Sequence, residues 1–481
     1  MKTSLKKNFI LQVLYQILII ITPLFTAPYI SRVLGPENVG INSYSYAVTS
    51  YFAIVAALGI ENYGSRLIAK TKDNREELNK QFSQLFTIHF LFAAIVYIIF
   101  LLYCVFVVKE NKLVFFIQSF VVLGVVFDIN WLYFGLEEFK KVITKNSILK
   151  LLNVALVFLL VRDKADLPIY VGIIAIGIFV NYAILWVGTQ KYVKLQRVNI
   201  KDCLVHIKPL FVLFLPAIAV MLYKYMDKIM LMNLKDSSSV GFYDSGEKII
   251  VLCLGLINAL GVVMLPRVSN LKAQGDEESI NRYFDKSLFV IGFISIGCAC
   301  GAFGVASDFV PLFFGKGYDP SITVMKGLAI TLPFSAYANV AKTQYVLPNG
   351  KDTFFARTLI GGALINFVIN FLLIPKCGVL GATIGTICTE VFVCVVQLVA
   401  ANKDMHTFKK LVKVSGFLGI GIIMILTLSL LDGISSDFLR IVVKVFSGGL
   451  TYLILSVLYC WFVNKQILVE ISGTLMKKLR K

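Results

Sequence analysis

The sequence predicts an all-α, polytopic membrane protein with about fourteen transmembrane helices. Two observations support this fold class. The first is composition: 58% of the 481 residues are hydrophobic, 16% are charged, and mean hydropathy is +0.80. A soluble protein of this length could not bury so much apolar surface. The second is charge patterning, because the Lys and Arg residues fall mostly in every second gap between the apolar segments.

Each predicted span is an apolar segment close to the length of roughly 20 residues that a bilayer requires. The fifth span is short, the eighth begins with polar residues, and the gaps between spans leave no room for an extramembrane domain. In chain order the predicted spans are 9–30, 40–61, 85–108, 113–136, 146–161, 168–188, 209–233, 241–266, 287–307, 324–347, 358–375, 379–400, 414–431 and 441–463.

The distribution of positive charge predicts the orientation. About 31 Lys and Arg residues lie on the side that carries the N-terminus and about 9 on the other, and positive loops stay in the cytoplasm. Both termini are therefore expected in the cytoplasm, with the protein in the cytoplasmic membrane. The stretches that carry most of this charge are 66–80, 140–145, 191–208, 267–286, 403–413 and 477–481.

Other function classes find little support in the sequence. The net charge of +19 follows from the positive-inside bias, and no nucleic-acid recognition module is present. Gly350-Lys351 is followed by Asp352 and lacks a P-loop pattern. There is no HExxH motif, the three histidines are far apart, and the nine cysteines are scattered. We therefore expect a protein that is not an enzyme and has no cofactor or metal.

The chain contains an internal echo. Val39-Gly40-Ile41-Asn42-Ser43-Tyr44 opens the second span, and Val240-Gly241-Phe242-Tyr243-Asp244-Ser245 opens the eighth. Six spans separate the two motifs, so they open on the same side of the membrane. This topology predicts a parallel repeat, and internal repeats in transporters commonly place the cargo site at the repeat interface.

Five stretches in order carry a family resemblance. They are Ser31-Arg32-Val33-Leu34-Gly35-Pro36-Glu37-Asn38-Val39-Gly40; Gly59 to Arg66 with the loop 72–75; 128–139, which reads DINWLYFGLEEF; Tyr225-Met226-Asp227-Lys228 leading to 240–243; and Asn366, Asn370, Ile374-Pro375, Gly378, Gly381-Ala382 and Glu390. The chain resembles the polysaccharide flippases of the multidrug/oligosaccharidyl-lipid/polysaccharide exporter superfamily over nearly its whole length.

The resemblance implies two six-helix lobes around a central cavity plus two C-terminal helices. The expected boundaries are 1–205 and 206–405 for the lobes and 406–481 for the added helices with a basic tail. It also implies that the protein moves undecaprenyl-pyrophosphate-linked oligosaccharide repeat units across the membrane by alternating access, for capsule or another surface polysaccharide. The expected partners are this lipid-linked oligosaccharide, membrane lipids, and a polysaccharide polymerase with chain-length machinery.

Charges inside the spans are the candidate site residues, because such charges are costly and normally face a bundle interior or a wet cavity. Lys224 and Lys228 share a helix face, and Asp227 can pair with Lys224. The candidate cations for an anionic cargo are Lys224, Lys228, Lys248, Arg32, Arg357 and Lys342. The candidate ion-coupling carboxylates are Asp227, Glu247 and Glu390. Each has an alternative: snorkelling for Lys342 and Arg357, and a structural Lys–Asp pair for Asp227.

Three other functions remain open from the residues. One is a multidrug or cation exporter of the same superfamily, which should have a cavity dominated by carboxylates and aromatic rings, whereas basic groups here match or exceed acidic ones. A membrane polysaccharide polymerase is a different class and would need catalytic groups on a sizeable outer loop. A non-transporting scaffold or scramblase is the last.

Overall fold

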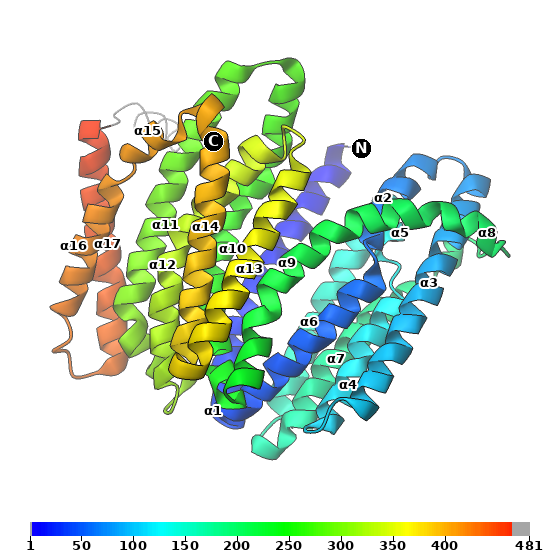
Figure 1. Cartoon of the computed structure of the whole chain (residues 1–481), viewed down its shortest axis with the longest axis horizontal. Coiled ribbons are helices and arrows are strands. Elements are labelled where there is room, and N and C mark those ends of the chain that lie inside the picture. Colours follow the sequence, from blue (N-terminus) through cyan, green and yellow to red (C-terminus); the bar gives the residue numbers. More distant parts are fainter. Residues whose placement is uncertain (1, 464–481) are drawn as a thin grey trace. The chain divides into compact units, whose positions relative to one another are not determined.

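The structure is a computed structural model that describes residues 2–463, except for the side chains of 2–14, 215–217, 219 and 223. The described residues are helical throughout, without strands (Figure 1). The chain divides into two compact units, Met1–Gly241 and Phe242–Lys481. Eleven helices of the described part are long and apolar enough to cross a membrane. The all-helical, polytopic fold is thus confirmed, whereas the count of about fourteen spans stays a prediction.

The first unit is built from nine α-helices and four short 3₁₀ turns. The helices are α1 (Lys2–Ala57), α2 (Ile60–Thr71), α3 (Arg75–Phe106), α4 (Lys112–Val126), α5 (Asn130–Gly135), α6 (Phe139–Leu160), α7 (Leu167–Ala183), α8 (Ile200–Cys203) and α9 (Ile207–Leu234). The 3₁₀ turns are η1 (Lys164–Asp166), η2 (Ile184–Trp186), η3 (Thr189–Lys191) and η4 (Leu204–His206).

The second unit holds the remaining helices, the first of which begins just before the division. They are α10 (Ser237–Gln274), α11 (Glu277–Phe314), α12 (Asp319–Ala341), the π-helical turn η5 (Lys342–Val346), α13 (Asp352–Cys377), α14 (Val379–Met405), α15 (Thr407–Val412), α16 (Gly416–Ser429) and α17 (Asp437–Val463). The predicted spans 414–431 and 441–463 correspond to α16 and α17, which pack on α11 through Phe289, Phe417 and Tyr452.

Helix α1 contains two predicted spans, one on each side of Gly35. The backbone there has φ 75° and ψ 170°, which a residue without a Cβ adopts readily, and Pro36 follows it. Pro23 and Pro28 also lie within α1, but the non-helical angles fall at Gly35. A second break ends α1 at Ala57, where Leu58 and Gly59 both have positive φ. The second span therefore ends earlier than predicted.

The fourth predicted span, 113–136, is divided between α4 and α5. Asp128 lies in the break, and its Oδ1 accepts hydrogen bonds from the backbone N–H and side-chain amide of Asn130, at 2.8 and 2.7 Å. Trp131 is fully buried and packs so closely on Gly64 that a Cβ there would lie 2.7 Å from its ring. Two of the sequence motifs, Gly59–Arg66 and 128–139, therefore meet where α2 contacts α5.

The two motifs of the internal echo also meet. A Cβ placed on Gly40 would lie 1.7 Å from the carbonyl oxygen of Ser237, and one on Gly241 would lie 1.9 Å from that of Pro36. Only glycine allows two backbones to approach so closely. The start of α10 is thus seated against the turn at Gly35–Gly40 of α1.

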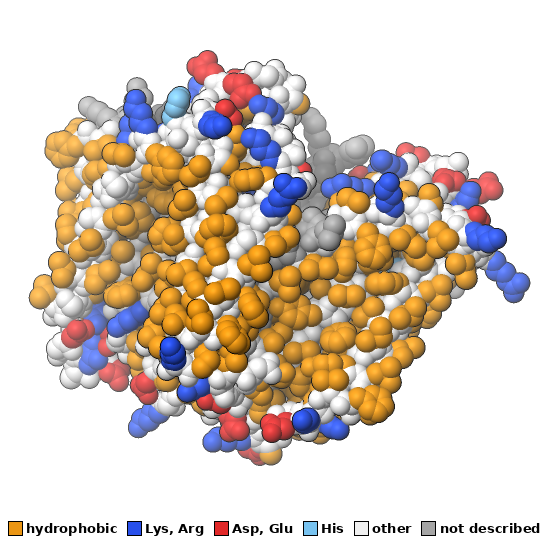
Figure 2. Space-filling model, viewed as in Figure 1, with side chains coloured by type: hydrophobic (Ala, Val, Ile, Leu, Met, Phe, Trp, Pro, Cys, Tyr) orange, Lys and Arg blue, Asp and Glu red, His pale blue; other side chains and the backbone are white. Residues whose placement is uncertain are grey.

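Charged side chains gather at the helix ends in each unit, while the helix middles present a hydrophobic surface (Figure 2). Large apolar residues of these middles are exposed, including Ile95, Val262, Phe371 and Leu453. Apolar exposure on this scale suits a protein surrounded by lipid tails. The fold therefore orients each unit with its helices across the bilayer.

Candidate functional site: charged and aromatic groups on α9 and their surroundings

The predicted cations Lys224 and Lys228 lie one turn apart on α9, in the first unit. Lys224 is exposed, and its Nζ lies 5.3 Å from the ring centroid of Tyr225, within the range of a cation–π contact. Lys228 is half-buried and engaged by neighbouring groups. Asp227 is 5% exposed and is also engaged by its neighbours. The three predicted charges on α9 are thus close in space, with the Asp227 carboxylate buried and the Lys224 side chain exposed.

Tyrosines from α1 complete this α9 group. The rings of Tyr46 and Tyr51 each lie 6.3 Å from Tyr225 in edge-to-face geometry. Tyr51 also reaches the backbone carbonyl of Leu222 across 3.4 Å. Tyr46 lies within electrostatic reach of Lys224 and Lys228, and Tyr51 within reach of Asp227. The packing of α1 on α9 thus creates a patch that combines ammonium groups with flat aromatic faces.

Arg32, another of the six predicted cations, lies on α1 ahead of the Gly35 break. It is exposed and engaged by neighbouring groups. It lies on the other side of the Gly35 break from Tyr46 and Tyr51, so it belongs to a different helical segment of α1 than the tyrosines. Sequence alone gave Arg32 and Lys224 the same role, but no contact recorded between described residues joins them.

The predicted residues of α10 lie in the second unit. Lys248 forms an ion pair with Asp244 one turn earlier, with 2.6 Å between Nζ and Oδ2. The Lys248 side chain remains 37% exposed, whereas that of Asp244 is 7% exposed. Glu247 is half-buried and engaged by its neighbours. Sequence analysis did not select Asp244, although its i,i+4 spacing from Lys248 was a readable signal.

The remaining predictions lie at separate places in the second unit. Lys342 begins the π-helical turn, and its Nζ lies 5.9 Å from the Phe355 ring. Arg357 is exposed on α13. Glu390 on α14 accepts a 2.6 Å hydrogen bond from the Ser335 hydroxyl of α12. The structure ties Glu390 to the α12–α14 contact, one of the most extensive in the second unit.

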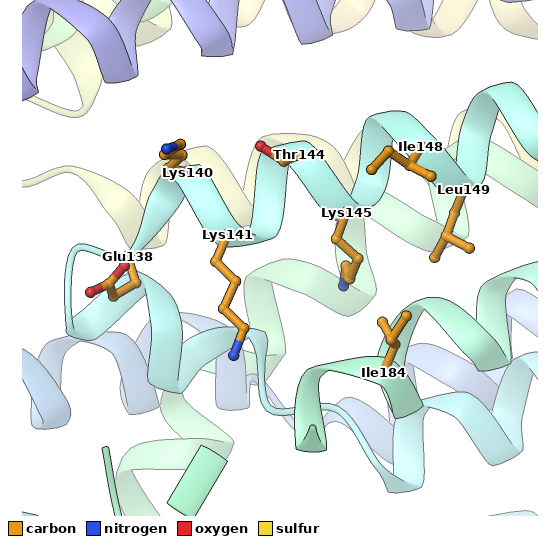
Figure 3. Close-up of a pocket in the computed structure, with 8 residues that line it drawn as sticks. All are labelled: Glu138, Lys140, Lys141, Thr144, Lys145, Ile148, Leu149 and Ile184. Atoms are coloured by element: carbon orange, nitrogen blue, oxygen red, sulfur yellow. The ribbon is translucent and has the colours of Figure 1, made fainter. Parts of the chain in front are cut away.

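Two cavities were not anticipated from the sequence. One, of about 530 Å³, opens beside Lys140, Lys141 and Lys145 at the start of α6 (Figure 3). Sequence analysis had read these lysines only as part of the positive-inside signal. The other, of about 630 Å³, is almost entirely apolar and lies among α11, α12, α14 and α16. Phe303, Phe334 and Leu418 are among the residues that line it.

A buried ionic cluster in the second unit was also missed. Lys444 of α17 is 2% exposed, and its Nζ lies 2.5 Å from Oδ2 of Asp308 on α11. Asp308 also pairs with Arg440 at 3.0 Å, and Lys444 also pairs with Asp432. The signal was available, since Lys444 is a charge inside a predicted span. Elsewhere, no group of three or more His, Cys, Asp or Glu in the described chain could hold a metal ion.

Comparison with known proteins identifies the family. Residues 5–272, more than half of the chain, match the model of the polysaccharide biosynthesis protein family. A protein of Shigella dysenteriae described as an O-antigen transporter is 25% identical over 403 residues, covering 83% of this chain and 100% of that protein. Such coverage extends the similarity well beyond the segment matched by the family model.

Two solved structures share the fold. An inward closed structure of the lipid II flippase MurJ aligns with a TM-score of 0.75 at 16% identity, covering 94% of this chain and 98% of that one. An inward-facing multidrug transporter of the MATE family, in the MOP superfamily, aligns with a TM-score of 0.61 at 14% identity, covering 82% and 96%. At such low identity these likenesses speak for the fold alone.

The motif resemblance, the family match and the shared fold agree with one another. These proteins are described as transporters and a flippase, which agrees with the expectation that this protein is not an enzyme. The chain is therefore a multi-pass membrane protein that belongs to the polysaccharide biosynthesis protein family of transporters, with the fold of the MOP superfamily.

Proposed function

We propose that this protein is a flippase that moves undecaprenyl-pyrophosphate-linked oligosaccharide repeat units from the inner to the outer leaflet by alternating access. The observation that carries the proposal is the α9 group, in which Lys224 and Lys228 stand beside the rings of Tyr46, Tyr51 and Tyr225, in a chain of this family. Ammonium groups attract pyrophosphate, and tyrosine offers both an apolar face and a hydroxyl to a sugar.

The remaining predicted cations are proposed to extend this anion-binding role. Lys248 keeps part of its ammonium group exposed despite its pair with Asp244. Lys342 and Arg357 lie nearer helix ends and would meet the pyrophosphate as it enters or leaves, as would Arg32. Lysine acts as a point charge and arginine as a bidentate fork toward phosphate, so both suit the same ligand.

The apolar cavity of the second unit supports a lipid-borne cargo. Its mostly aromatic and aliphatic lining offers few hydrogen-bonding partners to sugar hydroxyls, but it would accept a hydrocarbon chain. A carrier with a long polyprenyl tail and a polar head requires both kinds of surface within one protein. A surface polysaccharide such as capsule is the proposed destination of the sugar.

The test is transport in proteoliposomes that contain the full-length protein and an undecaprenyl-pyrophosphate oligosaccharide. Outward movement is measured as the fraction of sugar that an external glycosidase can reach. Lys224→Gln should lower the rate about tenfold, the effect of losing one charge-assisted contact. Lys208→Gln is the matched control, because Lys208 is exposed at the first turn of the same helix.

The proposal fails if the wild-type protein leaves the labelled oligosaccharide in its original leaflet. If transport occurs but Lys224→Gln and Lys228→Gln both match the wild-type rate, the flippase function stands and the role of the α9 lysines is wrong. The lysines of α9 would then not contact the cargo. Transport of an organic cation in the same liposomes would instead favour the multidrug exporter.

A further inference from the structure

The cavity beside α6 has no role in the function proposed above. It measures about 530 Å³ and lies entirely within the first unit, where α6 approaches the segment after α7. Lys141 and Lys145 extend from the same side of α6 toward the segment that carries Ile184 (Figure 3). The loop-charge pattern predicts that this end of α6 faces the cytoplasm, at the depth of the lipid headgroups.

The cavity lining changes from cationic to apolar along two adjacent rows of α6. One row is Lys140, Thr144 and Ile148, and the other is Lys141, Lys145 and Leu149. In each row the members are four residues apart, so they share a helix face. From the first to the last member is roughly 12 Å along the helix. A lipid shows the same polarity change from its headgroup to the start of its chains.

Exposed apolar side chains surround the apolar end of the cavity. Ile148 is 60% exposed, and Leu151, Leu152 and Ile184 are also exposed. Water does not favour such a surface, whereas a lipid chain lying along α6 would cover it. Leu152 continues the first row beyond the cavity, toward the middle of the predicted fifth span.

Neutral partners hold two of the lysines in place. Lys141 donates to the Tyr133 hydroxyl at 3.0 Å and to the Val187 carbonyl at 3.3 Å. Lys145 donates to the carbonyl and side-chain oxygens of Asn181, at 2.5 and 2.9 Å. An ammonium group has three donors, so each lysine keeps one N–H for a ligand while its charge is not cancelled by these partners.

The remaining charges leave the cavity cationic. Glu138, which also lines it, lies within electrostatic reach of Tyr192. Asp128 attracts Lys145 through space, but its own Oδ1 is occupied by Asn130. Lys140 is exposed and has no recorded hydrogen bond or ion pair with any described residue. The cavity is thus lined by three lysines and a single carboxylate, with Lys141 and Lys145 directed toward Ile184 and Lys140 on the other side of α6 (Figure 3).

We propose that this cavity binds the phosphate group of a membrane lipid, with the lysines on the phosphate and the lipid chain along Ile148, Leu149 and Ile184. The phosphate can come from two sources, an anionic glycerophospholipid of the membrane or a polyprenyl pyrophosphate. Both present anionic phosphate oxygens attached to a hydrocarbon, which is the chemistry that the two rows recognise. The proposal stands on this cavity alone and does not require the flippase function.

The experiment is a binding titration of the purified full-length protein in neutral detergent. The probes are dioctanoyl phosphatidylglycerol, dioctanoyl phosphatidylcholine and farnesyl pyrophosphate, with bound ligand counted by native mass spectrometry. Lys140→Gln should weaken binding of an anionic probe about fivefold, the effect of one lysine near a phosphate, while Lys140→Arg should keep it. Lys70→Gln is the matched control, because Lys70 is an exposed lysine on α2, outside the cavity lining.

Lys140 is chosen first because its loss breaks no recorded contact, so the variant should fold. The double variant Lys140→Gln/Lys145→Gln should weaken binding further, and its melting temperature reports whether it folds. Preference for phosphatidylglycerol assigns the site to a membrane lipid, and preference for farnesyl pyrophosphate assigns it to the polyprenyl carrier. The proposal is overturned if Lys140→Gln binds both anionic probes as the wild type does, or if phosphatidylcholine binds as tightly as they do.

Discussion

At the scale of single residues, Asp227 is the clearest candidate for ion coupling. It is almost completely buried beside two lysines on α9, and Tyr51 lies within reach of its charge. A buried carboxylate in a transporter either exchanges an ion during the cycle or pairs permanently with a neighbouring cation. Glu247 and Glu390 offer the same choice, although the bond from Ser335 ties Glu390 to its neighbouring helix.

Asp227→Asn separates these two roles. If Asp227 couples transport to an ion, the variant should lose transport driven by an imposed gradient and still bind the lipid-linked oligosaccharide, because the amide keeps the shape but not the charge. Transport and binding are measured in the same vesicles. Full transport at every imposed gradient would exclude coupling at Asp227, and loss of binding as well would indicate a structural pair.

Lys444 is the residue at which a substitution should affect stability most. It is buried between Asp308 and Asp432, and removing its charge leaves Asp308 at the α11–α17 contact with Arg440 as its recorded partner. Leaving a buried charge without a partner costs about 3–5 kcal/mol, and the loss here should be smaller because Arg440 still pairs with Asp308. Lys444→Met should therefore lower the melting temperature of the detergent-purified protein.

The double variant Lys444→Met/Asp308→Leu provides the control, because it removes the buried carboxylate together with its partner. It should be more stable than Lys444→Met alone. An exposed substitution such as Lys413→Met should change the melting temperature little. Equal melting temperatures for Lys444→Met and the wild type would contradict the importance of this cluster.

The burial of His206 predicts that the stability of the folded protein depends on pH. It is buried before α9, where its Nδ1 lies 2.9 Å from the Tyr63 hydroxyl and its Nε2 lies 3.4 Å from the Gln84 side-chain oxygen. Burial lowers the pKa of His206 below its usual 6.5. The unfolded chain therefore binds the proton first, so this contribution to stability is complete above about pH 6.5 and is lost as pH falls toward the lower folded pKa.

The melting temperature should accordingly fall more between pH 7.5 and 5.5 in the wild type than in His206→Gln, which cannot take up the proton. Differential scanning measurements on the two proteins, at both pH values, make the comparison. Identical losses in the two proteins would show that His206 does not contribute. The contributions of other titrating groups cancel when the two losses in melting temperature are compared, because both proteins contain those groups.

At the scale of helices, glycine contacts decide how the elements meet. The approach of α10 to the turn of α1 depends on Gly40 and Gly241, since a methyl group at either would overlap a backbone carbonyl. Backbone atoms cannot move aside as a flexible side chain can. The echo in the sequence thus marks a contact between its two copies, within residues that lie far apart in the chain.

Gly40→Ala and Gly241→Ala should each force these backbones apart, lowering both the melting temperature and the transport rate. Gly255→Ala in α10 is the matched control, because nothing lies within 4 Å of its added Cβ. That control should be neutral or slightly stabilising, by up to about 1 kcal/mol, since alanine favours a helix interior. Normal transport by both Gly40→Ala and Gly241→Ala would show that the close approach is dispensable.

At the scale of the whole molecule, topology is the main prediction. The alternating loop charges predict that both termini are cytoplasmic. Reporter fusions within 403–410 and at the C-terminus should read cytoplasmic, and a fusion at Lys316 should read external. An external C-terminus would contradict this topology.

Much of the fold could be predicted from the sequence because hydrophobicity and loop charge are properties of short segments. The apolar segments became helices, and α16 and α17 appear where two extra helices were expected. The structure departs from the predicted spans at Leu58–Gly59 and at Asp128, where a helix breaks inside a predicted span. Hydropathy does not register such breaks, because the residues around them remain apolar.

The sequence by itself determined that this chain is a helical membrane transporter, which family it belongs to, and which charges lie inside its spans. Only the tertiary structure decided which of these charges meet: Lys224 with Tyr225 and its neighbours, Lys444 with Asp308, and Lys145 with Asn181. Apart from the neighbouring Lys224 and Tyr225, these partners are separated by 36 or more residues. Their distance therefore depends on how whole helices pack, and no local pattern encodes it.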